Sequence, residues 1–426
     1  MQTAPHRPPA CAPPKLALPV RRARTATSAN LQTPMAPQQQ HNPYQHHING
    51  YLDPSLGYCR HLLEGIHAYV AQTPGVSFKV VPIRRLPKRL DSDETAGILL
   101  FRPTSVCRSL HRPGLAMVQL SGREEPGEIP TVLPDNHSLG ALAAQHLLDR
   151  GFQRFACLQR DFRLSKQRCE GFINTVGRAG WHVQVFPETD RFEEPICDWV
   201  AAQGRPVGVF FDCDDYAQTY ELALLQRGLQ VPDQAAIIGV NNDELLCEYT
   251  HTPLSSVDPN ARIIGFLAAR TVHRMLQGHP PDRLHQVVQP AAVVQRRSTD
   301  AFATDDPVLR TVLRYIQARA CQPIGVEDIL DQVPVSRRTL ERRFRDAFGR
   351  TLHDQIIRAR LDHAKHLILR TDLNLERIAN RAGFNNVKRF ITLFRQKTGT
   401  PPGQFRKQNK LARGPTQRQR PPQQPL

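Results

Sequence analysis

Residues 378–406 read I-A-N-R-A-G-F-N-N-V-K-R-F-I-T-L-F-R-Q-K-T-G-T-P-P-G-Q-F-R, which is the pattern of a helix, a tight turn and a second helix. Gly383 lies in the turn, where glycine adopts positive φ at no steric cost. The second helix is predicted from Asn385, and Phe390 and Phe394, four residues apart, face its core side. The residues left on its outer face are Lys388, Arg389, Thr392 and Arg395. The stretch therefore predicts a helix-turn-helix unit whose second helix is basic.

A similar unit precedes this one in the chain. Its supporting helix is predicted over 326–332, and Ser336 is placed to cap the next helix. In that next helix Leu340 and Phe344 are again four residues apart and face inward. Its outward residues are Arg337, Arg338, Glu341, Arg342 and Arg345. An amphipathic helix over 352–369 connects the two units, so together they predict one all-α domain.

The second helix of each unit carries most of the basic side chains. A charged helix face is usually only a solvated face. Here the bases are concentrated on the same helix of both units, and few acids interrupt them. Such a helix fits the major groove of DNA, where arginine can donate two hydrogen bonds to guanine. The pattern favours DNA binding over a merely solvated face.

The net charge of the 426-residue chain is +17, from 56 Lys and Arg against 39 Asp and Glu, and it is unevenly distributed. Residues 301–410 carry +11, residues 1–50 carry +5 and the tail from Leu411 carries +3, so residues 51–300 carry −2. The total alone admits nucleic acid, an anionic membrane surface or acidic ligands as partners. No stretch approaches the ~20 consecutive apolar residues of a membrane helix.

Four parts are predicted along the chain. A basic leader rich in Pro and Gln (1–50) and a basic tail (409–426) are expected to be disordered. Between them lie a near-neutral body (51–298) and the helical domain (299–408). The nine cysteines are scattered singly, with no pair at metal-binding spacing. We therefore expect a reducing, cytoplasmic setting, mostly buried thiols, and no metal or other cofactor.

The near-neutral body alternates short apolar runs with amphipathic segments. The apolar runs, predicted as buried strands, are 97–101, 115–120, 155–158, 207–211 and 236–240. The amphipathic segments, predicted as helices, are 138–150, 166–179 and 216–227. This alternation predicts an α/β fold with parallel strands in two lobes, in which a ligand binds beyond the carboxyl ends of the strands.

Polar residues gather at those predicted strand ends. Asp135-Asn136 precedes one helix, Asp212 to Asp215 follows one strand, and Asn241 to Glu244 follows another. Carboxylates and amides on converging loops can bind vicinal hydroxyls, as in a sugar cleft. The same residue types are common helix caps and turn formers, so the residues alone leave both interpretations open. The sequence has no G-x-S-x-G, phosphate-loop, H-E-x-x-H or G-x-G-x-x-G signature in the required context, so an enzyme is not expected.

Each half of the chain resembles a known family. The runs V-L-P-D-N-H-S-L-G-A-L-A-A-Q-H-L-L (132–148) and I-I-G-V-N-N-D-E-L-L (237–246) are similar to the LacI/GalR and periplasmic-binding-protein family. The run S-R-R-T-L-E-R-R-F-R-D-A-F-G-R-T (336–351), with the stretch quoted first, resembles the AraC/XylS family. The resemblance implies a two-lobed, type I periplasmic-binding-protein-like sensor domain, followed by an all-α domain with two helix-turn-helix motifs.

Functional positions follow from the resemblance residue by residue. Positions that contact the ligand in the sensor family match Asp135, Arg168, Asp214 and Asn241. Positions that read bases in the AraC family match Arg338, Glu341, Arg342, Lys388, Arg389 and Thr392. The chain departs from these families at Asn241, where Asp is frequent, at Cys213, where Asn is frequent, and at Pro334, where Gly is frequent. The departures in the sensor leave the identity of the sugar open.

A LacI-like sensor followed by an AraC-type DNA-binding domain is the arrangement of XylR-type regulators of xylose operons. The resemblance therefore implies a cytoplasmic transcription regulator, an activator of sugar-catabolic genes that is controlled by a monosaccharide such as D-xylose. The expected partners are double-stranded DNA with paired half-sites, the sugar, a second copy of the chain in a homodimer, and RNA polymerase as a further candidate. The alternatives are a DNA-binding regulator that answers another small ligand or none, and a carbohydrate-active enzyme.

Overall fold

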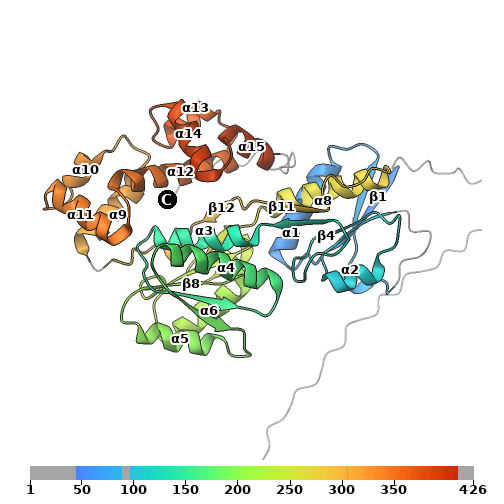
Figure 1. The fold of residues 1–426 in the computed structure, drawn as a ribbon, viewed down its shortest axis with the longest axis horizontal. Helices are drawn as coiled ribbons and strands as arrows, with labels where there is room; N and C mark the ends of the chain where they lie inside the picture. Colours follow the sequence, from blue (N-terminus) through green and yellow to red (C-terminus); the bar gives the residue numbers. More distant parts are fainter. Residues whose placement is uncertain (1–44, 89–95, 305, 411–426) are drawn as a thin grey trace, which may run out of the picture. The chain divides into compact units, whose positions relative to one another are not determined.

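The computed structural model describes residues 45–88, 96–304 and 306–410 (Figure 1). The predicted leader, up to residue 44, and the tail from residue 411 lie outside these residues. Two six-stranded sheets and a separate group of helices make up the described chain. Within it, none of the helices combines the length and the apolar character that crossing a bilayer requires.

The first sheet has the strand order β11-β5-β4-β3-β1-β2, with every pairing parallel. Its strands are β1 (His46–Tyr51), β2 (Val76–Val80), β3 (Gly97–Leu100), β4 (Met117–Gln119), β5 (Thr131–Pro134) and β11 (His285–Val288). The accompanying helices are α1 (Gly57–Val70), the 3-10 turn η1 (Ile83–Arg85), α2 (Thr104–Leu110) and α8 (Ala261–Leu276). We call this unit lobe 1. Its largest core joins the sheet to α1 and α8, around Leu62, Ile66 and Ile264.

The second sheet has the order β12-β10-β9-β8-β6-β7, in which only β12 runs antiparallel to its neighbour. Its strands are β6 (Phe155–Gln159), β7 (Val183–Pro187), β8 (Val207–Phe210), β9 (Ala235–Val240), β10 (Ser255–Asp258) and β12 (Ala292–Val294). The accompanying helices are α3 (Asn136–Leu148), α4 (Arg163–Arg178), α5 (Glu193–Ala202), α6 (Asp214–Gln226), α7 (Glu244–Tyr249) and the 3-10 turn η2 (Arg297–Thr299). We call this unit lobe 2. The predicted two-lobed α/β fold is therefore confirmed.

The chain passes between the lobes three times, after β5, after β10 and after β11. Each lobe is consequently built from segments that lie far apart in the sequence. Within lobe 2, the backbones of α3 and α4 lie in close contact. Gly140 and Gly171 permit this contact, because a Cβ atom on either would overlap a main-chain oxygen of the other helix. The two helices are thereby held together as one rigid pair.

Seven helices form the C-terminal part, which we call the reader domain (306–410). They are α9 (Pro307–Arg319), α10 (Val326–Leu330), α11 (Arg337–Phe348), α12 (Leu352–Arg370), α13 (Leu375–Arg381), α14 (Val387–Thr398) and α15 (Pro402–Lys410). α12 contributes Leu352 and Ile356 to the first core and Leu361 and Ile368 to the second, so it is the connector that the sequence predicted.

Several predicted boundaries differ from the structure, and two of the differences are instructive. β1 crosses the predicted end of the leader at residue 50, although its sequence HHINGY looks too polar for a buried strand. The strand pairs on both sides, with β2 and β3, and it needs a small residue at Gly50, where a Cβ would lie 2.5 Å from the ring of Phe78. Helix α14, the second helix of the second helix-turn-helix unit, begins at Val387 and not at Asn385. The side chain of Asn386 accepts a hydrogen bond from the Arg389 N–H and so caps the helix.

Candidate functional site

Two helices of the reader domain, α11 and α14, present the predicted DNA-contacting residues. Their inner faces are anchored by Leu340 and Phe344 in α11 and by Phe390 and Phe394 in α14, all fully buried. The caps are local: the Ser336 side chain accepts from the Thr339 N–H at the start of α11, as Asn386 does for α14. Burial of one stripe and a fixed first turn together determine which side chains point outward.

The outward faces carry the predicted residues. Seven of them are exposed, and Glu341 is half-buried; the exposed set is Arg337, Arg338, Arg342, Arg345, Lys388, Arg389 and Thr392. Arg337 is engaged within the protein, because its guanidinium pairs with Glu327 at 2.6 Å and with Glu341 at 2.9 Å. Arg389 lies 3.2 Å from the His353 ring nitrogen on α12. Their contacts with bases remain a prediction.

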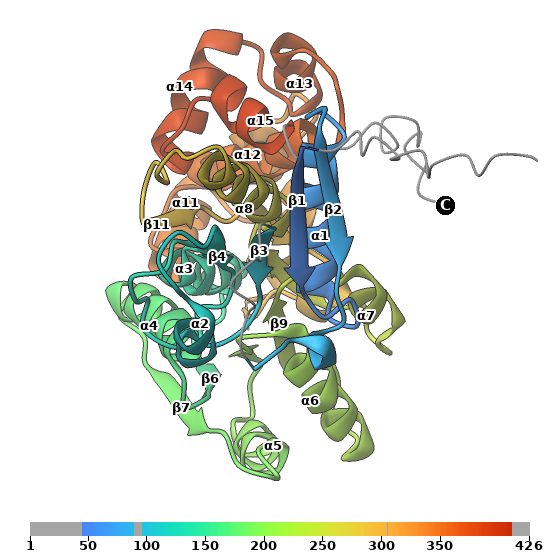
Figure 2. The same ribbon diagram turned by 90° about the vertical axis from the view of Figure 1, so that its right-hand side faces the viewer.

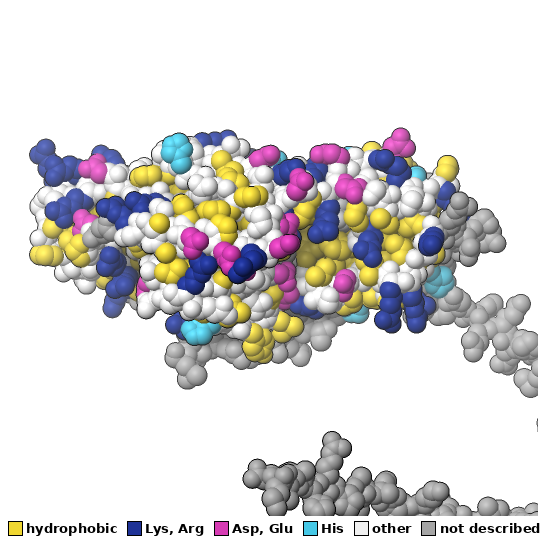
Figure 3. Space-filling model, turned by 90° about the horizontal axis from the view of Figure 1, so that it is seen from below, with side chains coloured by type: hydrophobic (Ala, Val, Ile, Leu, Met, Phe, Trp, Pro, Cys, Tyr) yellow, Lys and Arg dark blue, Asp and Glu magenta, His cyan; other side chains and the backbone are white. Residues whose placement is uncertain are grey.

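A cleft of about 330 Å³ lies where the two lobes meet. Its lining follows the carboxyl ends of strands from both sheets, as the topology predicts. Lobe 1 contributes Asp53, Tyr58, Phe101, Arg102, Ser121 and Arg123, and lobe 2 contributes Asn136, Arg160, Phe162, Arg168, Asp214 and Asn241, among others. In the view from below, hydrophobic side chains lie beside basic and acidic ones over the region between the lobes (Figure 3).

Arg168, on α4, is a buried charge that lines the cleft. Its Nε donates to the Asn136 Oδ1 at 3.0 Å, and its Nη1 donates to the Asp212 carbonyl oxygen. Burial lowers the pKa of Arg168, although the nearby Asp212 carboxylate opposes that effect. Asp212 pairs with Arg160 at 2.8 Å, and its Oδ1 has no hydrogen-bond partner among the described residues. Asp212 Oδ1 is therefore a buried acceptor without a partner, next to the guanidinium of Arg160.

Asp214, which follows β8, contacts β10 and the segment that follows β9 in lobe 2. Its Oδ1 accepts from the Ser256 hydroxyl at 2.6 Å, and its Oδ2 accepts from the Asp243 N–H at 2.9 Å. Burial raises the pKa of this carboxyl group to about 7, despite those hydrogen bonds. Asn241, which also lines the cleft, adopts a φ of 112°. A strained backbone at a ligand-facing loop is typical of a functional site.

Asp135 is placed differently from the other three predicted ligand residues. Its Oδ1 accepts from the Ser138 N–H at 3.0 Å and caps α3, while its Oδ2 accepts from the Gln289 side chain at 2.9 Å. Arg168, Asp214 and Asn241 line one cleft, whereas Asp135 is absent from its lining and Asn136 takes that place.

Several cleft residues were not predicted from the sequence. Phe162 is flanked by two cations, with the guanidinium of Arg123 4.7 Å and that of Arg160 4.5 Å from the ring centroid. The Tyr58 hydroxyl is buried without a hydrogen-bond partner among the described residues, and burial raises the pKa of the phenol. Arg160 and Phe162 directly follow a strand that the sequence did predict, so the strand-end rule could have found them. Apolar rings beside such donors and acceptors suit the faces and hydroxyls of a sugar.

The raised pKa of Asp214 predicts a pH dependence of stability. Because the folded-state pKa of about 7 exceeds the unfolded value of 3.8, the native state binds more protons than the unfolded state between these values. The contribution of Asp214 to the free energy of unfolding is therefore largest at low pH and falls as the pH rises through this window. Urea unfolding of the wild type and Asp214→Asn from pH 4.5 to 8 measures it. Parallel curves for the two proteins would contradict the assignment.

Comparison with known proteins agrees with both halves of the chain. Residues 144–299 match the periplasmic binding protein-like domain family, and residues 329–408 match a helix-turn-helix domain family of AraC type. The chain is 27% identical over 383 residues to the xylose operon regulatory protein of Escherichia coli strain K12, covering 86% of this chain and 98% of that protein. The xylose operon regulatory protein of Haemophilus influenzae is 26% identical to the chain over 288 residues, covering 65% of this chain and 74% of that protein.

A solved structure shows the same domain combination. The structure described as the xylose-binding transcription activator xylR superimposes with a TM-score of 0.53 at 26% identity, over 85% of this chain and 98% of that one. The chain is therefore a DNA-binding transcription regulator and not an enzyme, with a periplasmic binding protein-like domain followed by an AraC-type helix-turn-helix domain, and it resembles the xylose operon regulators over most of its length.

Proposed function

We propose that this protein activates genes of monosaccharide catabolism when a neutral sugar such as D-xylose binds in the cleft between lobes 1 and 2. The observation that carries the proposal is the convergence of Arg168, Asp214 and Asn241 on one cleft that both lobes line. The buried Tyr58 hydroxyl, which also lines the cleft, adds an unpaired hydrogen-bonding group there. The similar solved structure is described as xylose-binding, which makes D-xylose the first sugar to test.

The protein acts in the cytoplasm as a homodimer, in this proposal, with its two reader domains on paired half-sites of a promoter and RNA polymerase as a further partner. The functional domains correspond to residues 46–298 for the sensor and 299–408 for DNA reading. Sugar binding closes the lobes and changes how the two reader domains are spaced, because a ligand that prefers the closed state shifts the population toward it.

A thermal-shift screen with pentoses and hexoses tests the sugar. A ligand that binds only the folded state raises apparent stability, by about 2.7 kcal/mol at a hundredfold excess over Kd. We expect D-xylose or a close stereoisomer to raise the melting temperature of the full chain and to change its affinity for promoter DNA. If no sugar changed the melting temperature or the DNA affinity, the proposal that a sugar is the effector would be wrong, and only the proposal of DNA binding would stand.

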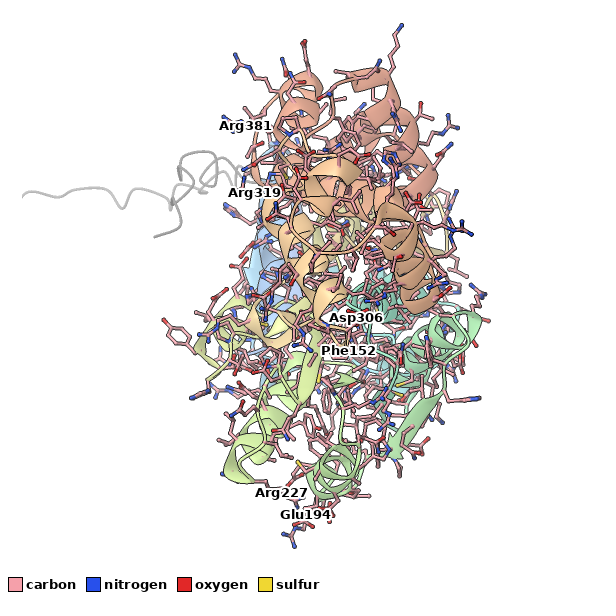
Figure 4. All side chains as sticks on the ribbon, turned by 90° about the vertical axis from the view of Figure 1, so that its left-hand side faces the viewer. Phe152, Glu194, Arg227, Asp306, Arg319 and Arg381 are labelled. Atoms are coloured by element: carbon pink, nitrogen blue, oxygen red, sulfur yellow. The ribbon has the colours of Figure 1, made fainter. Side chains whose placement is uncertain are left out.

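DNA reading by α11 is tested by Arg342→Ala. Loss of one base-reading arginine costs about 1–3 kcal/mol at a specific site and relaxes discrimination at the base that it reads. Fluorescence anisotropy with specific and scrambled duplexes measures both effects. Arg227→Ala is the control, because Arg227 lies on lobe 2, at the end of the molecule opposite the reader domain in Figure 4. Equal losses of affinity on the two duplexes would mean that Arg342 contacts phosphate only.

A further inference from the structure

Helix α3 runs from the cleft to the reader domain. At its first residue, Asn136 lines the cleft, accepts from Arg168 Nε at 3.0 Å and donates to the Gln167 side chain at 3.2 Å. At its other end, the capping residue Asp149 contacts Arg358 of α12 and Arg350, two residues before that helix. One straight element therefore has a ligand-facing group at one terminus and an interdomain contact at the other.

Asp149 holds two arginines of the reader domain. Its Oδ1 accepts from Arg358 Nη1 at 2.5 Å and lies 3.1 Å from Arg350 Nη1, while its carbonyl oxygen accepts from Arg350 Nη2 at 2.8 Å. The Asp149 side chain is 17% exposed and that of Arg350 10%. These pairs are shielded from solvent, in contrast to surface pairs that contribute little.

The two residues after Asp149 add neutral contacts to the same junction. The Arg150 carbonyl oxygen accepts from the Ala303 N–H at 3.0 Å, in the segment that leads into the reader domain. Gly151, at a φ of +82°, leaves room for the ring of Phe348, the last residue of α11, where a Cβ atom would overlap it. In Figure 4 the nearby residues Phe152 and Asp306 lie at this meeting point of sensor and reader domain.

The reader domain also touches lobe 1. α15 packs against α8, and Figure 2 shows the two helices side by side. The junction at 149–151 belongs to lobe 2, and the rigid α3–α4 pair joins it to Arg168. The reader domain is thus in contact with both halves of a cleft whose closure would move one half relative to the other.

We propose that Asp149 is a positioning residue that couples the state of the cleft to the orientation of the reader domain, through Arg350 and Arg358. This inference rests on the proposed function for the ligand, but the junction itself is independent of which ligand binds. With the Asp149 contacts intact, the first helix-turn-helix unit moves with lobe 2. Without them, cleft closure is no longer transmitted to α12, while the cleft and the two recognition helices keep their structures.

The junction can be tested without any effector. Limited proteolysis of the full chain should cut Asp149→Asn within residues 299–304 at least fivefold faster than the wild type, because a reader domain no longer held through Arg350 and Arg358 exposes the segment that leads into it. Asp149→Glu, which keeps the charge, should restore most of the protection. Asp198→Asn is the matched control: it removes another Asp–Arg pair of lobe 2, with Arg227 at 2.5 Å, far from the reader domain. Equal cutting rates for Asp149→Asn and the wild type would overturn the junction.

Coupling is tested with the sugar that shifts the wild type most. Coupling between two sites usually changes affinity by about 5- to 150-fold. In Asp149→Asn the sugar should bind as in the wild type but change DNA affinity by less than twofold, with recovery in Asp149→Glu. A full sugar response in Asp149→Asn would refute the coupling role while leaving the sugar proposal intact. If no sugar bound the wild type or changed its DNA affinity, the proposed function would be refuted instead. The proteolysis rates would still show whether Asp149 holds the reader domain against lobe 2.

Discussion

Arg168→Ala abolishes the response to sugar and leaves DNA binding in the absence of sugar within about twofold of the wild type; this is the expected result of removing the buried guanidinium from the cleft. Its side chain donates to the Asn136 side chain and to the Asp212 carbonyl oxygen, and both of these acceptors belong to lobe 2 and not to the reader domain. Both acceptors are left unpaired, which costs about 1–3 kcal/mol each in stability. The melting temperature should therefore fall as well.

Three measurements separate these effects. Thermal shift reports sugar binding, anisotropy reports DNA affinity, and urea unfolding reports the loss of stability. Lys166→Ala, on the same helix, is the control, because Lys166 forms an exposed pair with Asp161 outside the cleft. A sugar-induced shift of wild-type size in Arg168→Ala would mean that the ligand binds elsewhere.

Phe394→Ala is expected to abolish specific DNA binding through loss of the second recognition helix. Phe394 is fully buried, with its ring centroid 5.6 Å from that of Phe390 and 5.5 Å from that of Phe405. Truncation of a buried Phe costs about 3–5 kcal/mol. The whole stability of a domain is usually about 5–15 kcal/mol, so this loss is large for a core drawn from four helices and one turn.

The sugar response of the sensor should survive this change, since its cores share no residue with the core around Phe394. Circular dichroism at 222 nm, DNA anisotropy and sugar thermal shift measure the three properties. Leu393→Ala is the control: Leu393 directly precedes Phe394 and is just half-buried, so its truncation should have a clearly smaller effect on all three properties. Retention of wild-type DNA affinity by Phe394→Ala would show that α14 is not needed for binding.

The reader domain was predictable from the sequence because each of its helices shows its own boundary. Amphipathic spacing, Ser336 as a cap and Gly383 in the turn are local signals, and the structure confirms all three. The error at β1 arose where non-local packing decides, whereas the two-residue error at the start of α14 came from overlooking the local cap Asn386. β1 is a strand because β2 and β3 pair with it, and neither partner can be seen in the six residues of β1 itself.

The cleft was predicted only in part, for a similar reason. Arg168, Asp214 and Asn241 converge as expected, because parallel strands end at one edge. Asp135 and Asn136 are adjacent, and only the direction in which α3 leaves β5 determines that Asn136 faces the cleft while Asp135 caps the helix. Tyr58 was missed because the strand before it had not been recognised.

The threefold crossing between the lobes has a consequence for synthesis on the ribosome. The sheet of lobe 1 is completed only by β11, and that of lobe 2 only by β12, which ends at Val294. Neither lobe can reach its final hydrogen-bonded order until nearly 300 residues have been translated. The nascent sensor therefore stays incomplete, with open sheet edges, up to the moment when the DNA-binding helices begin to emerge. Domains normally fold in turn from the N-terminus. Here the sensor and the DNA-binding helices are expected to fold almost together, at the end of translation.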